Sequence, residues 1–341
     1  MSEFTIIEQF FKKPFSNVCT QSAVTLGIGD DAAIINPQQK GGGAWVVCVD
    51  TLVEGVHFLP IATAEDIAYK SLAVNISDFA AMGATPYWMT LSLTLPHMDK
   101  AWLARFSRAL YQLASQYGIY LVGGDTTRGP LSVTVQLMGL NPTDHVSALL
   151  RSGAKPNQIV AVSGDLGGAS LGLDILQERV QQMDAGALSR LNRPEPRLAL
   201  GHLLRGFASS CIDISDGLVG DLLHICRASA VSAIIDVEQL PIYEGLYFGV
   251  TPPDGDTFDT AVAKAVTFGD DYELLFTIDA EKWKPFMDAV DQVKHATNGL
   301  KVTQIGTTRP LMNDRPLLSW RRLGQPYQFQ EERLSAYEHF T

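Results

Sequence analysis

The residues of this sequence best suited to chemistry are aspartates that lie beside glycines or at the ends of apolar runs. They are Asp30, Asp31, Asp50, Asp125, Asp213, Asp216, Asp270 and Asp271. If the strand ends that carry them converge, the carboxylates cannot all ionise side by side unless cations neutralise them. Clustered carboxylate oxygens favour magnesium, which commonly accompanies phosphate groups. The first hypothesis is therefore a metal-dependent phosphoryl-transfer enzyme.

The densest motif is Gly-Gly-Asp-Thr-Thr-Arg-Gly at residues 123–129, which follows an apolar run at 119–122. A hairpin turn does not require paired glycines, an acid, two hydroxyls and an arginine in so short a segment. Glycine also allows the backbone to approach a ligand closely. This motif therefore favours a functional interpretation over a purely structural one.

Other candidates have an ordinary structural explanation as well. Asn75 and Asp78 lie three residues apart on an apolar helix and could bind either a neighbouring loop or a metal. Ser215 or Asp216 could be the N-cap of the helix that follows. Residues 164–170 are rich in glycine and resemble a phosphate-binding loop at the start of a helix, but the chain contains no Gly-Lys-Ser/Thr. Both interpretations stay open for each of these segments.

The composition indicates a globular protein that is not a nucleic-acid binder. The chain has 341 residues, a net charge of −11 and 46% hydrophobic residues. A non-specific nucleic-acid binder would carry a basic patch or stripe. No apolar run approaches the length of a membrane-spanning helix, and no secretory signal is visible at the N-terminus. The scattered cysteines, with no Cys-x-x-Cys pair, predict a reducing, cytoplasmic location.

The hydrophobic pattern predicts two α/β domains. A break at residues 141–157, rich in turn residues, separates a domain over 1–145 from a domain over 146–341. Asp99 and Gly118 are expected to cap the two ends of the second helix. The expected strands are 44–49, 87–95, 119–122, 131–140, 158–163, 231–237 and 273–278, and the expected helices are 65–84, 100–117, 169–181 and 218–227.

Taken together, the motifs resemble those of the thiamine-monophosphate kinase family. The matching segments follow one another in order along nearly the whole chain, and this order is more specific than any one motif. They are residues 27–31, 50–58, 75–84, 123–129, 151–156, 212–218 and 271–274.

The resemblance implies a phosphotransferase that moves the γ-phosphoryl group of ATP onto thiamine monophosphate, the last step of thiamine diphosphate biosynthesis. It also implies the two-domain α/β fold of aminoimidazole ribonucleotide synthetase. In that fold the N-terminal domain binds metal and ATP and pairs with its copy in a homodimer. The C-terminal domain closes over nucleotide and substrate.

The same matching implies roles for individual residues and a requirement for several Mg²⁺ ions. The implied magnesium ligands are Asp30, Asp50, Asp78, Asp125, Asp213 and Asp216, among which Asp50 and Asp213 are expected to matter most for turnover. The implied nucleotide contacts are Gly124, Asp125, Arg151 and Ser215. The implied substrate contacts are His57, Asp270 and Tyr337.

The chain departs from the family pattern at two places. Cys48 and Val49 stand where the family often has hydroxyl residues, so a backbone carbonyl would have to replace a hydroxyl contact to metal. Asp270 stands where the family commonly has glutamate, which is one methylene longer. These departures affect one expected metal contact and one expected substrate contact.

Three alternatives share the fold: aminoimidazole ribonucleotide synthetase, selenophosphate synthetase and the hydrogenase-maturation dehydratase. The last two rely on a reactive cysteine or selenocysteine, near the N-terminus or at the C-terminal end respectively. Cys19 has no lysine closely after it, and the sequence ends in Glu-His-Phe-Thr, so both are disfavoured. A non-catalytic metal- or nucleotide-binding regulatory protein is the alternative from a different class, and degenerate acids would be its mark.

Overall fold

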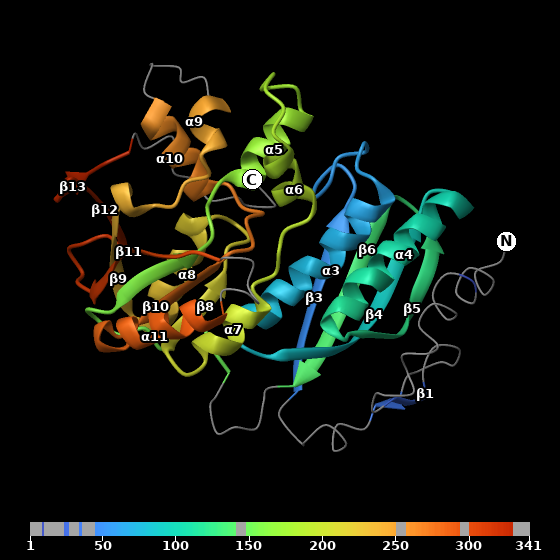
Figure 1. Cartoon of the computed structure of the whole chain (residues 1–341), viewed down its shortest axis with the longest axis horizontal. Helices are drawn as coiled ribbons and strands as arrows, with labels where there is room; N and C mark the ends of the chain where they lie inside the picture. The colour runs from blue at the N-terminus through green and yellow to red at the C-terminus, as the bar shows by residue number, and fades with distance from the viewer. Residues whose placement is uncertain are drawn as a thin grey trace. The chain divides into compact units, whose positions relative to one another are not determined.

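The computed structural model describes residue 9 and residues 24–26, 34–35, 45–140, 148–249, 257–293 and 300–329. These residues form two compact units, which are described separately (Figure 1). The first contains the described residues up to Phe79 and from Ala84 to Leu140, and the second contains Ala80–Gly83 and those from Ala148 onward. Four residues named above, Cys19, Asp30, Asp31 and Tyr337, lie outside the described residues.

The first unit is built around a four-stranded sheet in the order β3-β6-β4-β5. β4 and β5 are parallel and are connected through α4, whereas the other neighbours are antiparallel. A separate antiparallel pair consists of β1 and β2. The elements are β1 (Val24–Leu26), β2 (Ile34–Ile35), β3 (Trp45–Val53), α3 (Ala64–Ala81, whose last residues belong to the second unit), β4 (Thr85–Leu95), α4 (Lys100–Tyr117), β5 (Tyr120–Arg128) and β6 (Ser132–Leu140).

α4 has the boundaries that the sequence predicts. The Asp99 carboxylate accepts hydrogen bonds from the Ala101 and Trp102 N–H groups at 2.8 and 3.1 Å, and Gly118 ends the helix with φ 68°. Figure 1 shows α3 and α4 on the same face of the sheet. Buried strand residues such as Leu91 and Leu93 alternate with residues that face the other way, so one face of the sheet is the core face.

Two strands extend further than the sequence predicts, and both extensions concern candidate residues. β3 continues to Val53, so Asp50 lies inside the strand and not after it. β5 includes most of the Gly-Gly-Asp-Thr-Thr-Arg-Gly motif, which the sequence placed after a strand over 119–122. The β-branched threonines suit a strand, and Gly124 allows the close approach to β4, because a Cβ at this position would overlap the Leu91 carbonyl.

The second unit is a seven-stranded sheet in the order β13-β12-β9-β11-β7-β10-β8, with helices packed against it. Its elements are β7 (Ile159–Ser163), α5 (Gly168–Leu176), α6 (Ala185–Asn192), α7 (Leu198–Leu204), β8 (Ala208–Asp213), α8 (Leu218–Ser229), β9 (Val231–Asp236), η4 (Val237–Gln239), α9 (Gly245–Gly249), α10 (Thr257–Thr267), β10 (Leu274–Ile278), α11 (Ala280–Val293), β11 (Val302–Pro310), β12 (Leu318–Arg322) and β13 (Gln325–Tyr327). α5 is shorter than predicted, because the chain leaves the helix at Gln177 and adopts a left-handed conformation at Glu178.

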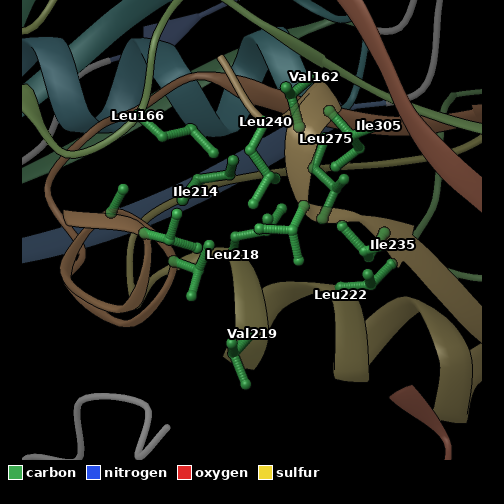
Figure 2. Close-up of a cluster of buried hydrophobic side chains, with 14 of the residues drawn as sticks. Val162, Leu166, Ile214, Leu218, Val219, Leu222, Ile235, Leu240, Leu275 and Ile305 are labelled. Atoms are coloured by element: carbon green, nitrogen blue, oxygen red, sulfur yellow. The ribbon is translucent and has the colours of Figure 1, made fainter. Parts of the chain in front are cut away.

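Both faces of this sheet are covered by apolar side chains. Val160 and Val162 of β7 belong to one buried cluster, whereas Ile159 and Ala161 belong to another. Figure 2 shows the first cluster, in which Leu218, Val219 and Leu222 of α8 meet strand residues that include Val162, Ile235, Leu275 and Ile305. A strand buried on both faces reads as a continuous apolar run, which is why β7 and β10 are evident in the sequence. No helix in the described part of the chain has the length and apolar content to cross a membrane.

We expect the replacement Gly139→Ala in β6 to destabilise the protein. A Cβ at Gly139 would overlap the Thr85 carbonyl and crowd Phe79 and Pro86, so backbone would have to move. The free energy of unfolding, measured with urea, should fall by about 1–3 kcal/mol. The matched control is Gly206→Ala, where no atom lies within 4 Å of the new methyl group and no such loss is expected. Equal effects of the two replacements would contradict this packing.

Candidate active site

In the first unit, Asp50 and Asp78 form a pair of carboxyl groups between β3 and α3. Asp50 points to the helix-covered face of the sheet, and a side-chain hydrogen bond joins it to Asp78. Burial raises the pKa of Asp50, and the bond to Asp78 acts in the opposite direction. Two carboxyl groups can share a hydrogen bond only when one is protonated, and a divalent cation can take the place of that proton.

The neighbouring Asn75 is fixed by hydrogen bonds and is completely buried. Its amide nitrogen donates to the Ser71 carbonyl at 3.0 Å, and the Cys48 thiol donates to its side-chain oxygen at 3.4 Å. Asn75 therefore ties α3 to β3 one turn before Asp78. The hydrogen bonds of Asn75 give this residue a structural role. Asp78, one turn further along the helix, is the residue that pairs with Asp50.

His57 is held in the turn that follows β3. Its Nδ1 accepts a hydrogen bond from the Val53 N–H at 3.0 Å, and the Lys70 ammonium donates to its backbone carbonyl at 3.2 Å. Since Nδ1 is the acceptor, the neutral ring carries its proton on Nε2. The His57 ring is thus held in one orientation by the backbone of Val53.

Within one chain, the structure does not bring Asp125 to Asp50. Asp125 lies on β5 and is exposed beside Ser92, on the face of the sheet away from the helices. β5 and β3 are separated by β4 and β6, so at about 4.8 Å per step their backbones are roughly 14 Å apart. The two carboxylates also point to opposite faces. They cannot bind one metal ion in a single subunit.

In the second unit, five predicted residues gather around the end of β8. The Cys211 N–H donates to the Leu150 carbonyl at 2.9 Å, which places Arg151 alongside the strand that ends at Asp213. The Asp270 N–H donates to the Ser215 carbonyl at 2.9 Å. The residues brought together in this way are Arg151, Asp213, Ser215, Asp216 and Asp270.

The structural explanation for Ser215 and Asp216 as helix caps is wrong. The N-cap of α8 is Gly217, with φ 101°, and no side chain caps the helix. The backbone must leave β8 in a conformation that suits glycine, and this moves the cap one residue beyond the two polar side chains. Ser215 and Asp216 are therefore not needed for the cap and lie half-buried beside Asp213.

Sequence reasoning missed Asp221, a buried acid of the same cluster. Its carboxylate accepts a hydrogen bond from the Asp216 N–H at 3.2 Å, and its side chain is only 2% exposed. Burial raises its pKa to about 8, with further contributions from the charges of Asp213 and Asp216. The available signal was an acid within the apolar face of α8, three residues after Leu218.

Asp271 is the second residue whose role becomes clear only in the structure. Both oxygens of its carboxyl group accept the Gly167 N–H, at 2.8 and 3.0 Å, and the Ala169 N–H is a further donor to it. A carboxyl group of the protein therefore occupies the start of α5, where the glycine-rich sequence resembled a phosphate-binding loop. Burial raises the pKa of Asp271 to about 8.

Glu273 anchors the same segment to the core of the second unit. Arg197 binds its carboxylate through two nitrogens, Nε at 2.7 Å and Nη2 at 2.6 Å, and the Ser163 hydroxyl donates to it at 2.5 Å. Both charged side chains are nearly buried, at 2% exposure for Glu273 and 11% for Arg197. A bidentate ion pair fixes both the distance between the two side chains and their relative orientation. The start of β10, which follows Glu273, is therefore held rigidly.

The donor atoms at these places fit magnesium better than zinc. Asp50 and Asp78 in the first unit, and Asp213 and Asp216 in the second, supply hard carboxylate oxygens. In the described part of the chain, no group of three or more His, Cys, Asp or Glu residues is arranged to hold a metal by itself. Magnesium commonly takes one or two carboxylates and completes its shell with water and phosphate, so a carboxyl pair fits it.

Comparison with known proteins identifies the family. A family model described as the N-terminal domain of AIR synthase related proteins matches residues 29–141. The thiamine-monophosphate kinase of Escherichia coli (strain K12) is 46% identical over 280 residues, which are 81% of this chain and 82% of that protein. The chain belongs to the thiamine-monophosphate kinase family.

Solved structures agree with this family membership and confirm the predicted fold class. The thiamine-monophosphate kinase from Stenotrophomonas maltophilia K279a is 37% identical, with a TM-score of 0.79, over 96% of this chain and 98% of that chain. A structure of AaThiL complexed with AMPPCP and TMP is 28% identical, with a TM-score of 0.71, over 87% of each chain. The fold is the α/β fold of the aminoimidazole ribonucleotide synthetase-like proteins, as the motifs implied.

The raised pKa of Asp271 predicts a pH dependence of stability. The unfolded chain loses this proton near pH 4, whereas the folded chain keeps it until about pH 8. The contribution of Asp271 to the free energy of unfolding therefore falls as the pH rises through this window. In urea titrations, the free energy of unfolding of the wild type minus that of Asp271→Asn should decrease between about pH 5 and pH 8. A difference that does not change with pH would contradict a raised pKa.

Proposed function

We propose that the protein transfers the γ-phosphoryl group of ATP directly to the phosphate of thiamine monophosphate, which gives thiamine diphosphate and ADP. Identity of 46% over most of the chain carries this proposal. The related protein bound to AMPPCP and TMP supports both substrates, because AMPPCP is an ATP analogue and TMP is the substrate in the family's name. The carboxyl pair of Asp50 and Asp78 provides the chemistry that the reaction needs.

The nucleophile is an oxygen of the substrate's own phosphate, which is ionised near neutral pH. It attacks the γ-phosphorus in line, the bond to the β,γ-bridging oxygen breaks, and ADP leaves. The reaction needs no enzyme base and no phospho-enzyme. Its difficulty is that two anions must meet, so positioning and charge neutralisation account for most of the catalysis.

Magnesium, when bound, neutralises the phosphate oxygens of both substrates. We propose that Asp50 and Asp78 hold it in the first unit and that Asp213 and Asp216 hold it in the second. By resemblance, Asp30 belongs to the same set. Each of these residues supplies carboxylate oxygens, the ligands that magnesium prefers.

The remaining residues bind and orient the substrates. Arg151 is a permanent cation near Asp221 and is suited to bind a phosphate of ATP, for which the Ser215 hydroxyl is a second proposed contact. Gly124 allows the backbone of β5 to approach the nucleotide. His57 and Asp270 contact thiamine monophosphate, and the resemblance adds Tyr337 to these contacts.

Cys48 does not take over the hydroxyl contact that the family often has at this position. Its thiol already donates to Asn75, and a thiol is a poor ligand for magnesium. The backbone carbonyl of the strand is the remaining oxygen for this contact.

We propose a homodimer formed through the face of the four-stranded sheet that lies opposite the described helices α3 and α4. Trp45, Val47 and Val49 of β3 alternate along this face and are 42%, 51% and 58% exposed. β3 is also an edge strand, and exposed apolar edges are covered in most native proteins.

The proposed location is the cytoplasm. In the described residues Cys48, Cys211 and Cys226 form no disulfide, and burial raises the pKa of the Cys211 and Cys226 thiols. Thiols of this kind serve as small apolar side chains in a reducing compartment.

Incubation with ATP, Mg²⁺ and thiamine monophosphate should yield ADP and thiamine diphosphate in equal amounts, as chromatography measures. Asp50→Asn and Asp213→Asn should each lower kcat on the order of 100-fold or more, because a neutral amide binds magnesium poorly. The control is Asp288→Asn on α11, an exposed acid paired with Lys284 at 3.2 Å, which should leave kcat unchanged. Near-wild-type kinetics in both site variants, with melting temperatures preserved, would refute the proposed metal roles.

A further inference from the structure

Two residues at the start of β10 have a backbone conformation that is rare for their type. Asp270 has φ 65° and Tyr272 has φ 50°, both in the left-handed region. For a bulky residue such as tyrosine this conformation is costly, and it persists only where the surroundings enforce it. Such strain commonly marks a segment whose exact course matters for function.

Main-chain hydrogen bonds to the loop after β8 hold one side of this segment. The Asp270 N–H donates to the Ser215 carbonyl and the Tyr272 N–H donates to the Ile214 carbonyl, both at 2.9 Å. The backbones are so close that a Cβ at Gly269 would overlap the Ser215 carbonyl. The segment that carries Asp270 is therefore fixed against the loop that carries Asp213 and Asp216.

The Asp271 side chain holds the other side of the segment. Its carboxyl group accepts the Gly167 N–H at 2.8 and 3.0 Å and lies at the start of α5. Helix capping alone would explain Asp271, but it would not explain why the two flanking residues are both left-handed. Alternating left-handed residues turn Asp271 into the core and leave Asp270 half-buried at the acidic cluster.

The Tyr272 hydroxyl completes the arrangement by donating to the Asp270 carboxylate, with 3.2 Å between the two oxygens. The Tyr272 side chain is only 9% exposed, so its ring is fixed by packing. Aspartate has a single methylene, so the position of its carboxylate follows the backbone and one side-chain rotation. The bonds of Asp271 fix the backbone at Asp270. The bond from the Tyr272 hydroxyl fixes the side-chain rotation of Asp270.

We propose that Asp271 and Tyr272 are positioning residues, which hold the Asp270 carboxylate in the orientation that binds thiamine monophosphate. The inference rests on the proposed function, in which Asp270 contacts this substrate. Neither residue touches the substrate itself, since both side chains point into the protein.

The first test is Tyr272→Phe, which removes one hydroxyl and leaves the packing in place. We expect kcat/KM for thiamine monophosphate to fall about tenfold, because a hydrogen bond to a charged group is lost, while KM for ATP stays within about twofold. The matched control is Tyr243→Phe, which removes a hydroxyl that donates to Asp184 at 2.9 Å elsewhere in the same unit. This control should retain wild-type kinetics for both substrates.

The second test is Asp271→Asn, whose amide oxygen can keep only part of the hydrogen bonding to α5. We expect kcat/KM for thiamine monophosphate to fall at least about fivefold at a temperature where the variant is fully folded. Its control is Asp174→Asn on α5, the helix at whose start Asp271 lies, which breaks an ion pair with Lys264 of α10. That variant should lose melting temperature but keep its kinetics.

Wild-type kinetics for Tyr272→Phe would overturn the inference, as would equal losses for both substrates or equal kinetic losses in Asp271→Asn and Asp174→Asn. A wild-type enzyme that does not convert thiamine monophosphate would refute the proposed function, and this inference with it. An active wild type with an unaffected Tyr272→Phe variant would refute the inference alone. The two failures are therefore distinguishable in one set of assays.

Discussion

Carboxyl groups in contact repel each other unless a proton or a cation lies between them, and the first unit is organised around this constraint. Asp50 and Asp78 meet because a strand and a helix present them to each other across a packed core. The buried Asn75, bonded to Cys48 on β3, keeps the helix from sliding along the strand. The apolar core thus supplies the force that holds two like groups together.

The second unit meets the same constraint in a different way. Asp216 and Asp270 lie on loops, which can relax, and carboxyl groups that accept backbone N–H groups fix these segments. Asp221 binds the backbone of Asp216, and Asp271 binds the backbone of Gly167. The Glu273–Arg197 ion pair holds the start of β10, which follows this segment in the chain. The acidic residues of the second unit therefore fall into two groups: the candidate ligands, and Asp221 and Asp271, whose carboxyl groups hold the nearby backbone in place.

Much of the fold could be predicted from the sequence, because local signals and the tertiary structure agree. The ends of α4 follow from Asp99 and Gly118, and β7 follows from its continuous apolar run. The course of β5 could not be predicted, because glycines and an acid indicate a turn locally and pairing with β4 decides otherwise. The same limit applies to Asp221, whose burial and contacts depend on how α8 packs against the sheet.

In the acidic clusters, the sequence indicated candidate residues but not which of them lie close together. Asp213 and Asp270 are far apart in the chain and adjacent in space, because β8 and β10 pair side by side. Asp50 and Asp125 both end up in the four-stranded sheet, yet on opposite edges and faces. Strand order and register, which carry this information, are tertiary properties that no local pattern encodes.

The parallel pairing of β4 with β5 has a consequence for how the protein folds. Parallel neighbours cannot be joined by a tight turn, so β5 reaches its place only after the chain has passed through the whole of α4. Contacts of this kind form slowly, because a long loop must close before any pairing energy is gained. Residues 123–128 are therefore expected to become ordered after α4 has formed, and not before it.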